Sequence, residues 1–247
     1  MRNTTPSRTR KVTTATGVGI ATVALSFALV GCGSSTKTDE KKAETTSSKT
    51  ESATSSATTT SSKPEKSGLT SPETTGTHRT IQDYIKENNI QDTVINRGDP
   101  GPAIDLPVPD GWEVKTGLPA APYGAIVYSA SKVPSNPPRI LAIFEKLTGN
   151  VDPKEILALA PGELQNFAGY EGPAEGQPST LSGFDAVQLG GSYTADGEKG
   201  RVAQKTVVIP AQDGLYVLQL NAFSSEAEAD ILGQATDVVD EKTTITP

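Results

Sequence analysis

The only cysteine of the chain lies in a context that specifies a chemistry for its thiol. Cys32 ends the run Leu29-Val30-Gly31-Cys32, which follows a basic segment over residues 1–11 and an apolar stretch over residues 18–30. Basic residues, a short apolar stretch and a small residue before the cut are typical of a secretory signal peptide. In lipoproteins a diacylglycerol group alkylates the sulfur of such a cysteine before a peptidase cleaves ahead of it. We therefore predict a signal peptide over residues 1–31 and lipidation of Cys32.

Two other interpretations of this segment compete with lipidation: Cys32 is an incidental or buried thiol, or residues 18–30 remain as an uncleaved anchor helix. The apolar stretch is shorter than the roughly 18 residues that a spanning helix needs. Each buried acyl methylene contributes ~0.8 kcal/mol to membrane binding, so two chains hold a protein stably on a bilayer. We expect diacylglycerol and palmitate on Cys32, and the mature protein anchored on the extracytoplasmic face of the cell membrane, with a fraction secreted.

Other reactive constellations are missing from the sequence. One cysteine forms no internal disulfide or thiolate metal cage, and the one histidine, His78, precedes the predicted domain, which excludes a Ser-His-Asp triad there. No phosphate-binding glycine loop or calcium loop is present. Carboxylates such as Glu145, Glu163 and Asp185 are numerous, and most should form a solvated surface. We predict no catalytic residue, no metal and no cofactor, while a hydrolase that uses paired carboxylates stays open as an alternative.

The chain changes composition after Cys32. Residues 33–79 are about half Ser and Thr, with Leu69 as the one large apolar residue. Such a segment cannot bury enough surface to offset its conformational entropy. We therefore predict a disordered tether over residues 32–79, with a solvated His78 at its end. Residues 80–247 carry 11 Lys and Arg against 23 Asp and Glu, a net charge of −12, which argues against nucleic acid as a partner.

The first half of the domain predicts a short helix and then strands. Thr80 and Asp83 are suited to the start of a helix over residues 80–87. Strands are expected over residues 104–108, from Trp112 onward, over 125–128 and over 140–147. Pro107 limits the pairing of the first strand or places it at an edge.

The second half predicts a helix, three strands and a final helix. Asp152 and Pro153 begin a helix that runs to Phe167 with a kink at Pro161. Residues 169–178 predict a loop, and strands over 184–193, 202–209 and 215–222 are joined by Asp-Gly turns of the hairpin type. Ser225 is predicted to cap the last helix. This order indicates an α+β sandwich, an antiparallel sheet covered by helices.

Aromatic side chains gather in the predicted sheet and middle helix. An antiparallel sheet with a helix laid over it can leave an apolar cleft beneath that helix, which suits an elongated ligand. The competing interpretation is that the rings simply fill the core. The side chains that we predict to bind a ligand in the cleft are Trp112, Tyr123, Tyr128, Phe144, Phe167 and Tyr170.

Several long strings of the domain carry a resemblance to a known family. They include Thr80-Ile-Gln-Asp-Tyr-Ile85, Ile104-Asp-Leu-Pro-Val-Pro-Asp-Gly-Trp112, Gln188-Leu-Gly-Gly-Ser-Tyr193, Val202-Ala-Gln-Lys-Thr-Val-Val-Ile-Pro210 and Val217-Leu-Gln-Leu-Asn-Ala222. Together with the signal and the tether, they resemble the LpqN/LpqT family of mycobacterial lipoproteins, most closely its LpqN members. The likeness covers the whole of residues 80–247.

The resemblance implies a PsbP/Mog1-like fold and a role without catalysis. It implies binding of acylated glycolipids of the trehalose type and assistance to mycolate-lipid transport and cell-envelope assembly. The implied partners are mycolate-lipid exporters and secreted mycolyltransferases. The alternative is a protein-interaction module without a lipid pocket of its own, whose acidic surface docks such envelope proteins or host proteins.

Overall fold

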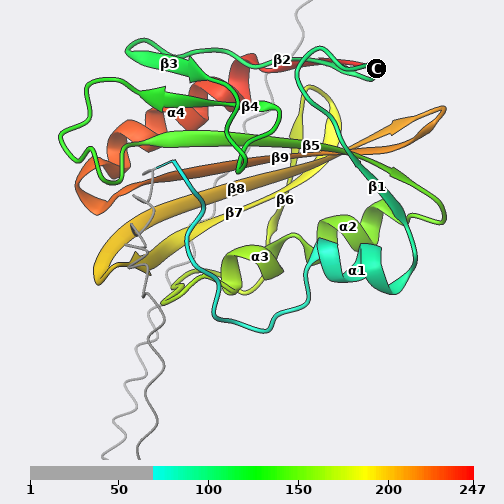
Figure 1. The fold of residues 1–247 in the computed structure, drawn as a ribbon, viewed down its shortest axis with the longest axis horizontal. Coiled ribbons are helices and arrows are strands. Elements are labelled where there is room, and N and C mark those ends of the chain that lie inside the picture. Colours follow the sequence, from blue (N-terminus) through cyan, green and yellow to red (C-terminus); the bar gives the residue numbers. More distant parts are fainter. Residues whose placement is uncertain (1–68) are drawn as a thin grey trace, which may run out of the picture. The chain divides into compact units, whose positions relative to one another are not determined.

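Figure 1 shows the protein as a computed structural model, which describes residues 69–247. The predicted signal peptide, Cys32 and most of the predicted tether lie outside the described residues. The helices are α1 (Ile81–Glu87), α2 (Pro153–Leu159), α3 (Pro161–Gln165) and α4 (Ala229–Lys242), with a 3-10 turn η1 (Glu226–Glu228). The strands are β1 (Gln91–Val94), β2 (Ala103–Asp105), β3 (Trp112–Lys115), β4 (Gly124–Tyr128), β5 (Arg139–Thr148), β6 (Gln177–Leu181), β7 (Phe184–Ala195), β8 (Glu198–Ala211), β9 (Gly214–Ser225) and β10 (Thr244–Thr246).

The strands form one large antiparallel sheet in the order β3-β4-β5-β9-β8-β7-β6 (Figure 1). Strands β4 and β1 pair with successive parts of the long β5, and β2 pairs with β10 in a separate small sheet. The three longest strands, β7, β8 and β9, are joined by the two predicted Asp-Gly turns. In the first turn Asp196 and Gly197 both have positive φ, 52° and 83°, which a tight hairpin of this hand requires. The predicted hairpins are confirmed.

Helices cover both faces of the sheet, because the strands alternate apolar side chains between them. On β5, Ile140, Ala142 and Phe144 point toward the face covered by α4, while Leu141 and Leu147 point toward the face covered by α1–α3. Figure 1 shows α4 on one side of the strands and α1–α3 on the other. The predicted α+β class is confirmed. We call these surfaces the α4 face and the α1–α3 face.

The predicted helix starts are confirmed for the first two helices. Thr80 and Asp83 form a reciprocal capping box at α1, and the Asp152 side chain accepts the amide of Lys154 at α2. The predicted kink at Pro161 is a break, since Pro161 begins the separate helix α3. The prediction for the last helix is wrong in detail. Ser225 ends β9 and makes no cap, a 3-10 turn follows it, and α4 begins at Ala229.

Three short strands, β1, β6 and β10, were not predicted. Strand β6 begins at Gln177, inside the predicted loop over residues 169–178. The strand expected over residues 104–108 is limited to Ala103–Asp105, because its partner β10 has three residues and Pro107 lacks an amide hydrogen. Each of these short strands is stabilised by hydrogen bonds to the strand beside it, and its own residues show no pattern that predicted it.

The ordered fold begins before the predicted boundary at Thr80. Residues 73–79, which we call the strap, lie along α3 and the loop after it. The backbone carbonyl of Asn166 accepts hydrogen bonds from the amides of Thr75 (2.7 Å) and Gly76 (3.0 Å). Its side chain forms two more with His78, since Oδ1 accepts from the His78 amide (2.7 Å) and Nδ2 donates to the His78 carbonyl (2.8 Å). Gly162 faces the carbonyl of Arg79 so closely that a Cβ there would clash. The His78 side chain is exposed, as predicted.

The Asn166 side chain should be the clamp that holds the strap. We expect Asn166→Ala to lower the free energy of unfolding by about 1–2 kcal/mol, since two hydrogen bonds to His78 are lost from a buried position. Amide hydrogen exchange at residues 75–78 should accelerate at the same time. Urea unfolding and exchange mass spectrometry measure the two effects. Asn150→Ala, at an exposed asparagine, is the control, and equal effects of the two variants would contradict the clamp.

Candidate functional site

An apolar pocket opens on the α4 face. It encloses about 120 Å³, and β3, β4, β5, α4 and the segments that flank β2 contribute side chains to it. Its lining comprises Arg97, Leu106, Val108, Val114, Gly124, Ala125, Ile126, Ile140, Ala142 and Val239. Val108 and Val114 are 46% and 49% exposed, and only one other large apolar residue of the described chain, Val94, is this exposed. The pocket therefore has an apolar lip in contact with solvent.

Strand register explains the depression in the sheet. Gly124 pairs directly with Ala142, which sets two of the smallest side chains side by side on the α4 face. The next row on that face is Val114, Ile126 and Ile140, whose larger side chains form one wall. Val239 of α4 closes the pocket from above. A row of small residues beside a row of large ones leaves a space that α4 does not fill.

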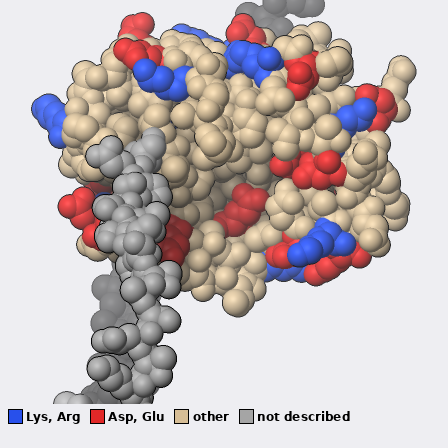
Figure 2. Space-filling view, in the orientation of Figure 1, with Lys and Arg blue, Asp and Glu red and all other residues tan. Residues whose placement is uncertain are grey.

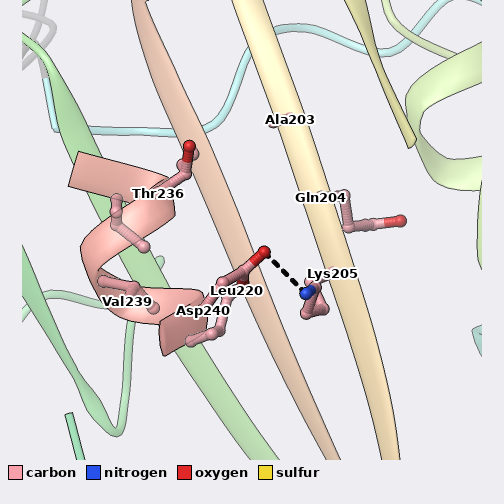
Figure 3. Close-up of a pocket in the computed structure, with 9 residues that line it drawn as sticks. Ala203, Gln204, Lys205, Leu220, Thr236, Val239 and Asp240 are labelled. Carbon is pink, nitrogen blue, oxygen red and sulfur yellow. Dashed lines mark ion pairs between the residues drawn. The ribbon is translucent and has the colours of Figure 1, made fainter. Parts of the chain in front are cut away.

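A smaller pocket of about 30 Å³ lies between α4 and the strands β5, β8 and β9 (Figure 3). Ile140 and Val239 line both pockets. Figure 3 shows Lys205 pointing toward α4, where its Nζ pairs with Asp240 Oδ2 at 2.7 Å, while Gln204 points away on the other side of β8. The Lys205 side chain is 8% exposed, and both partners of this ion pair line the smaller pocket.

The six predicted ligand-binding aromatics do not meet in one cleft. On the α4 face, Trp112 packs near Tyr128 (ring centroids 5.9 Å) and Tyr123 near Phe144 (5.4 Å). On the α1–α3 face, Phe167 lies beside Tyr193 and Phe223, and Tyr170 packs against the same cluster. None of the six lines the apolar pocket. The apolar pocket lies under α4, whereas the predicted cleft lies under the middle helix, and the six rings pack into the cores on the two faces. Their contact with a ligand stays a prediction.

Two of the carboxylates singled out from the sequence come together on the α1–α3 face. Burial raises the pKa of Glu145 to about 7, with further contributions from Asp92 and Glu163. Burial also raises the pKa of Glu163, against hydrogen bonds that its Oε2 accepts from Gln219 and Gln204, both at 2.9 Å. Figure 2 shows a hollow between the sheet and the layer of α1–α3, with acidic side chains inside it.

The third carboxylate, Asp185, lies on β7 beside the edge strand β6, opposite Thr180, away from this hollow. Among the described residues no group of three His, Cys, Asp or Glu side chains is placed to hold a metal ion. The part of the chain that the structure describes also contains no helix that is both long and apolar enough to cross a membrane. The direct hydrogen-bond partners of Glu163 are two uncharged amides, those of Gln204 and Gln219.

Residues 77–246 match the model of a protein family described as "Probable lipoprotein LpqN". The chain belongs to this LpqN family. The lipoprotein LpqN of Mycobacterium tuberculosis (strain ATCC 25618 / H37Rv) is 52% identical over 229 residues, which cover 92% of this chain and 97% of the relative. A lipoprotein named LpqT from Mycobacterium leprae (strain TN) is 25% identical over 142 residues, covering 56% and 62%. The resemblance seen in the sequence strings is confirmed.

A solved structure of an LpqN protein has the same fold. It is described as "Crystal structure of LpqN involved in cell envelope biogenesis of Mycobacterium tuberculosis", and it is 52% identical with a TM-score of 0.68. All of that crystallised chain aligns with 70% of the present one. An LpqN domain therefore folds without a counterpart of the remaining 30%, which supports experiments on residues 69–247 alone.

Sequence reasoning missed the apolar pocket because small and aliphatic residues line it. The predicted site consisted of large aromatic rings, whereas the space arises where Gly124 and Ala142 pair. One signal was present: Val114 on the edge strand β3 and Val108 in the loop between β2 and β3 are exposed apolar residues. Only the register of β3, β4 and β5 shows that these exposed valines border a pocket.

Proposed function

We propose that this LpqN-family protein is a membrane-anchored extracytoplasmic lipoprotein that binds acylated glycolipids of the trehalose type without covalent chemistry. In this proposal the protein assists mycolate-lipid transport and cell-envelope assembly, alongside mycolate-lipid exporters and secreted mycolyltransferases. Cys32 carries the lipid anchor. The observation that carries the proposal is the apolar pocket under α4 with its exposed valine lip. The involvement of the crystallised LpqN relative in cell envelope biogenesis supports the same process.

The dimensions of the pocket suit the end of an acyl chain. Its volume of about 120 Å³ is similar to that of an engineered apolar cavity of ~150 Å³ that binds benzene. About six carbons therefore fit inside, and the rest of a longer chain lies over Val108 and Val114. Six methylenes contribute about 5 kcal/mol at ~0.8 kcal/mol each. Association costs of several kcal/mol leave a weak, reversible complex, which suits carrying rather than storage.

The alternative function is a protein-interaction module that uses its charge. Residues 80–247 have a net charge of −12, and Figure 2 shows many acidic side chains on the face that it views. Such a surface favours basic partners and makes association sensitive to salt. We prefer the binding of lipids because a charged surface alone accounts for neither the pocket nor its exposed apolar lip.

Filling the pocket should abolish acyl binding. We expect Ala142→Leu, which adds three carbons beside Gly124, to weaken the affinity of residues 69–247 for dodecyl trehalose at least tenfold. Calorimetric titration below the micellar concentration measures the affinity, and native mass spectrometry detects the adduct. Ala130→Leu, at an exposed loop position, is the matched control.

A second variant tests the same pocket independently, in case Ala142→Leu does not fold. Val114→Glu places a charge on the lip at a position that is 49% exposed and so leaves the core unchanged. It should weaken binding as well, with an unchanged melting temperature. If both variants are folded and bind like the wild type, the acyl site lies elsewhere. If the wild type binds no alkyl glycoside but captures basic proteins in low salt, the interaction module is the better assignment.

A further inference from the structure

Arg97 is the one charged side chain in the lining of the apolar pocket. It lies in the turn between β1 and β2, and its guanidinium sits over the ring of Tyr123, with Cζ 5.1 Å from the ring centroid. The ring is itself fixed, since Tyr123 is 6% exposed and its hydroxyl donates to the Ile104 carbonyl at 3.3 Å. A buried aromatic platform therefore holds the cation beside the apolar space.

The guanidinium of Arg97 lies next to Gly124. A Cβ on Gly124 would lie 3.6 Å from Arg97 Nη2 and 3.8 Å from Nε, in van der Waals contact. Gly124 also has a φ of 134°, a conformation that other residues rarely adopt. The same glycine thus lines the pocket directly beside the cation.

Within residues 69–247, Arg97 has no carboxylate partner, although the domain is strongly acidic. The ion pairs there engage Arg79, Lys115, Lys146, Lys199, Arg201 and Lys205. No Asp or Glu lines the apolar pocket. An unpaired guanidinium at the opening of an apolar pocket is suited to a ligand that brings an apolar chain and a negative charge together.

We propose that the pocket binds amphiphiles that carry an oxyanion, a carboxylate or a sulfate or phosphate ester, close to the acyl chain, and that Arg97 binds this oxyanion. The inference rests on the proposed acyl-binding function and adds that, among acylated glycolipids, those with an oxyanion close to the acyl chain bind most tightly. A planar guanidinium bonds such an oxyanion through two parallel N–H groups, which neither a lysine nor a neutral donor reproduces. A sugar hydroxyl gains less from the same contact because it carries no charge.

The test compares two probes with the same chain on residues 69–247. Dodecanoate should bind five- to tenfold more tightly than the neutral dodecyl glucoside at low salt, and the preference should shrink as salt rises. Arg97→Gln should remove the preference, because it should weaken the binding of dodecanoate at least fivefold more than that of dodecyl glucoside. Arg97→Lys should keep part of the preference, since the positive charge remains but the planar group with two parallel N–H donors is lost. Lys86→Gln, on the opposite face of the sheet, is the matched control.

The outcomes separate this inference from the proposed function. If dodecyl glucoside binds as tightly as dodecanoate and Arg97→Gln weakens both equally, Arg97 contributes only packing and the head-group inference is overturned. If neither probe binds the wild type, the acyl pocket itself is refuted. Equal loss of preference in Lys86→Gln would show that net charge, rather than Arg97, selects the anion, and would also overturn the inference.

Discussion

Replacing Phe144 by alanine should lower the free energy of unfolding by about 3–5 kcal/mol, the usual range for a buried phenylalanine. Phe144 has no exposed surface, and its ring lies 5.4 Å from that of Tyr123 and 5.4 Å from that of Tyr216. The substitution removes both ring contacts and leaves a cavity between the sheet and α4. For a domain of this size the melting temperature should fall by about 6–20 °C. Urea and thermal unfolding of residues 69–247 measure the two quantities.

Two control variants test whether the expected loss of stability comes from the cavity left by Phe144 or from any substitution on the α4 face. Phe144→Leu keeps most of the volume and should cost less than half as much. Val114→Ala, at a residue that is 49% exposed, should change stability by no more than about 0.5 kcal/mol. If Phe144→Ala costs no more than Val114→Ala, the ring is not part of a close-packed core. A ligand role for Phe144 would then call for a binding test of its own.

The Glu145 carboxyl should make the protein less stable as the pH rises from about 4.5 to 7. Its pKa is raised to about 7 in the folded state, first by burial and then by Asp92 and Glu163, whereas an unfolded chain has the ordinary value of 4.5. The folded state therefore holds the proton more tightly, so this contribution to stability is complete below pH 4.5 and is lost as the pH rises through 7. With solvent screening of a partly exposed group, we expect a loss of about 2 kcal/mol.

The variant Glu145→Gln isolates this contribution from the other titrating groups. It should be about 2 kcal/mol more stable than the wild type at pH 8 and nearly equal to it at pH 4.5, in urea unfolding at both values. Glu241→Gln, on an exposed position of α4, should show no such pH-dependent difference. A stability difference for Glu145→Gln that is the same at both pH values would contradict the raised pKa.

Local signals in the sequence were sufficient for the elements that carry their own start and turn residues. The capping box at Thr80, the cap at Asp152 and the turn at Asp196-Gly197 all act through neighbours a few residues away, and all are confirmed. Ser225 failed as a cap because β9 extends through it, so pairing with β8 decided its conformation. Strands β1 and β10 depend likewise on partners that are distant in the sequence, β5 and β2. Strand β6 pairs with the adjacent β7 across the turn Ser182-Gly183, a local signal that our predictions did not use.

The candidate site was harder to predict than the fold for the same reason. Aromatic residues such as Phe144 and Phe167 are conspicuous in a sequence, yet the structure places them in cores on opposite faces. The pocket arises from the pairing of Gly124 with Ala142, 18 positions apart, and from a helix near the C-terminus. No local pattern specifies an empty space that three distant segments enclose.

The clamp at Asn166 also determines where mechanical load enters the domain. A force that pulls on the chain at its described N-terminal end first reaches the Thr70 carbonyl, which accepts from Arg139 Nη2 at 2.8 Å, and the Glu73 carbonyl, which accepts from the Ala168 amide at 3.2 Å. The bonds of Thr75, Gly76 and His78 follow, and since all of them end on Asn166, this residue passes their load to the loop after α3. All of these bonds must break before the same force acts on α1.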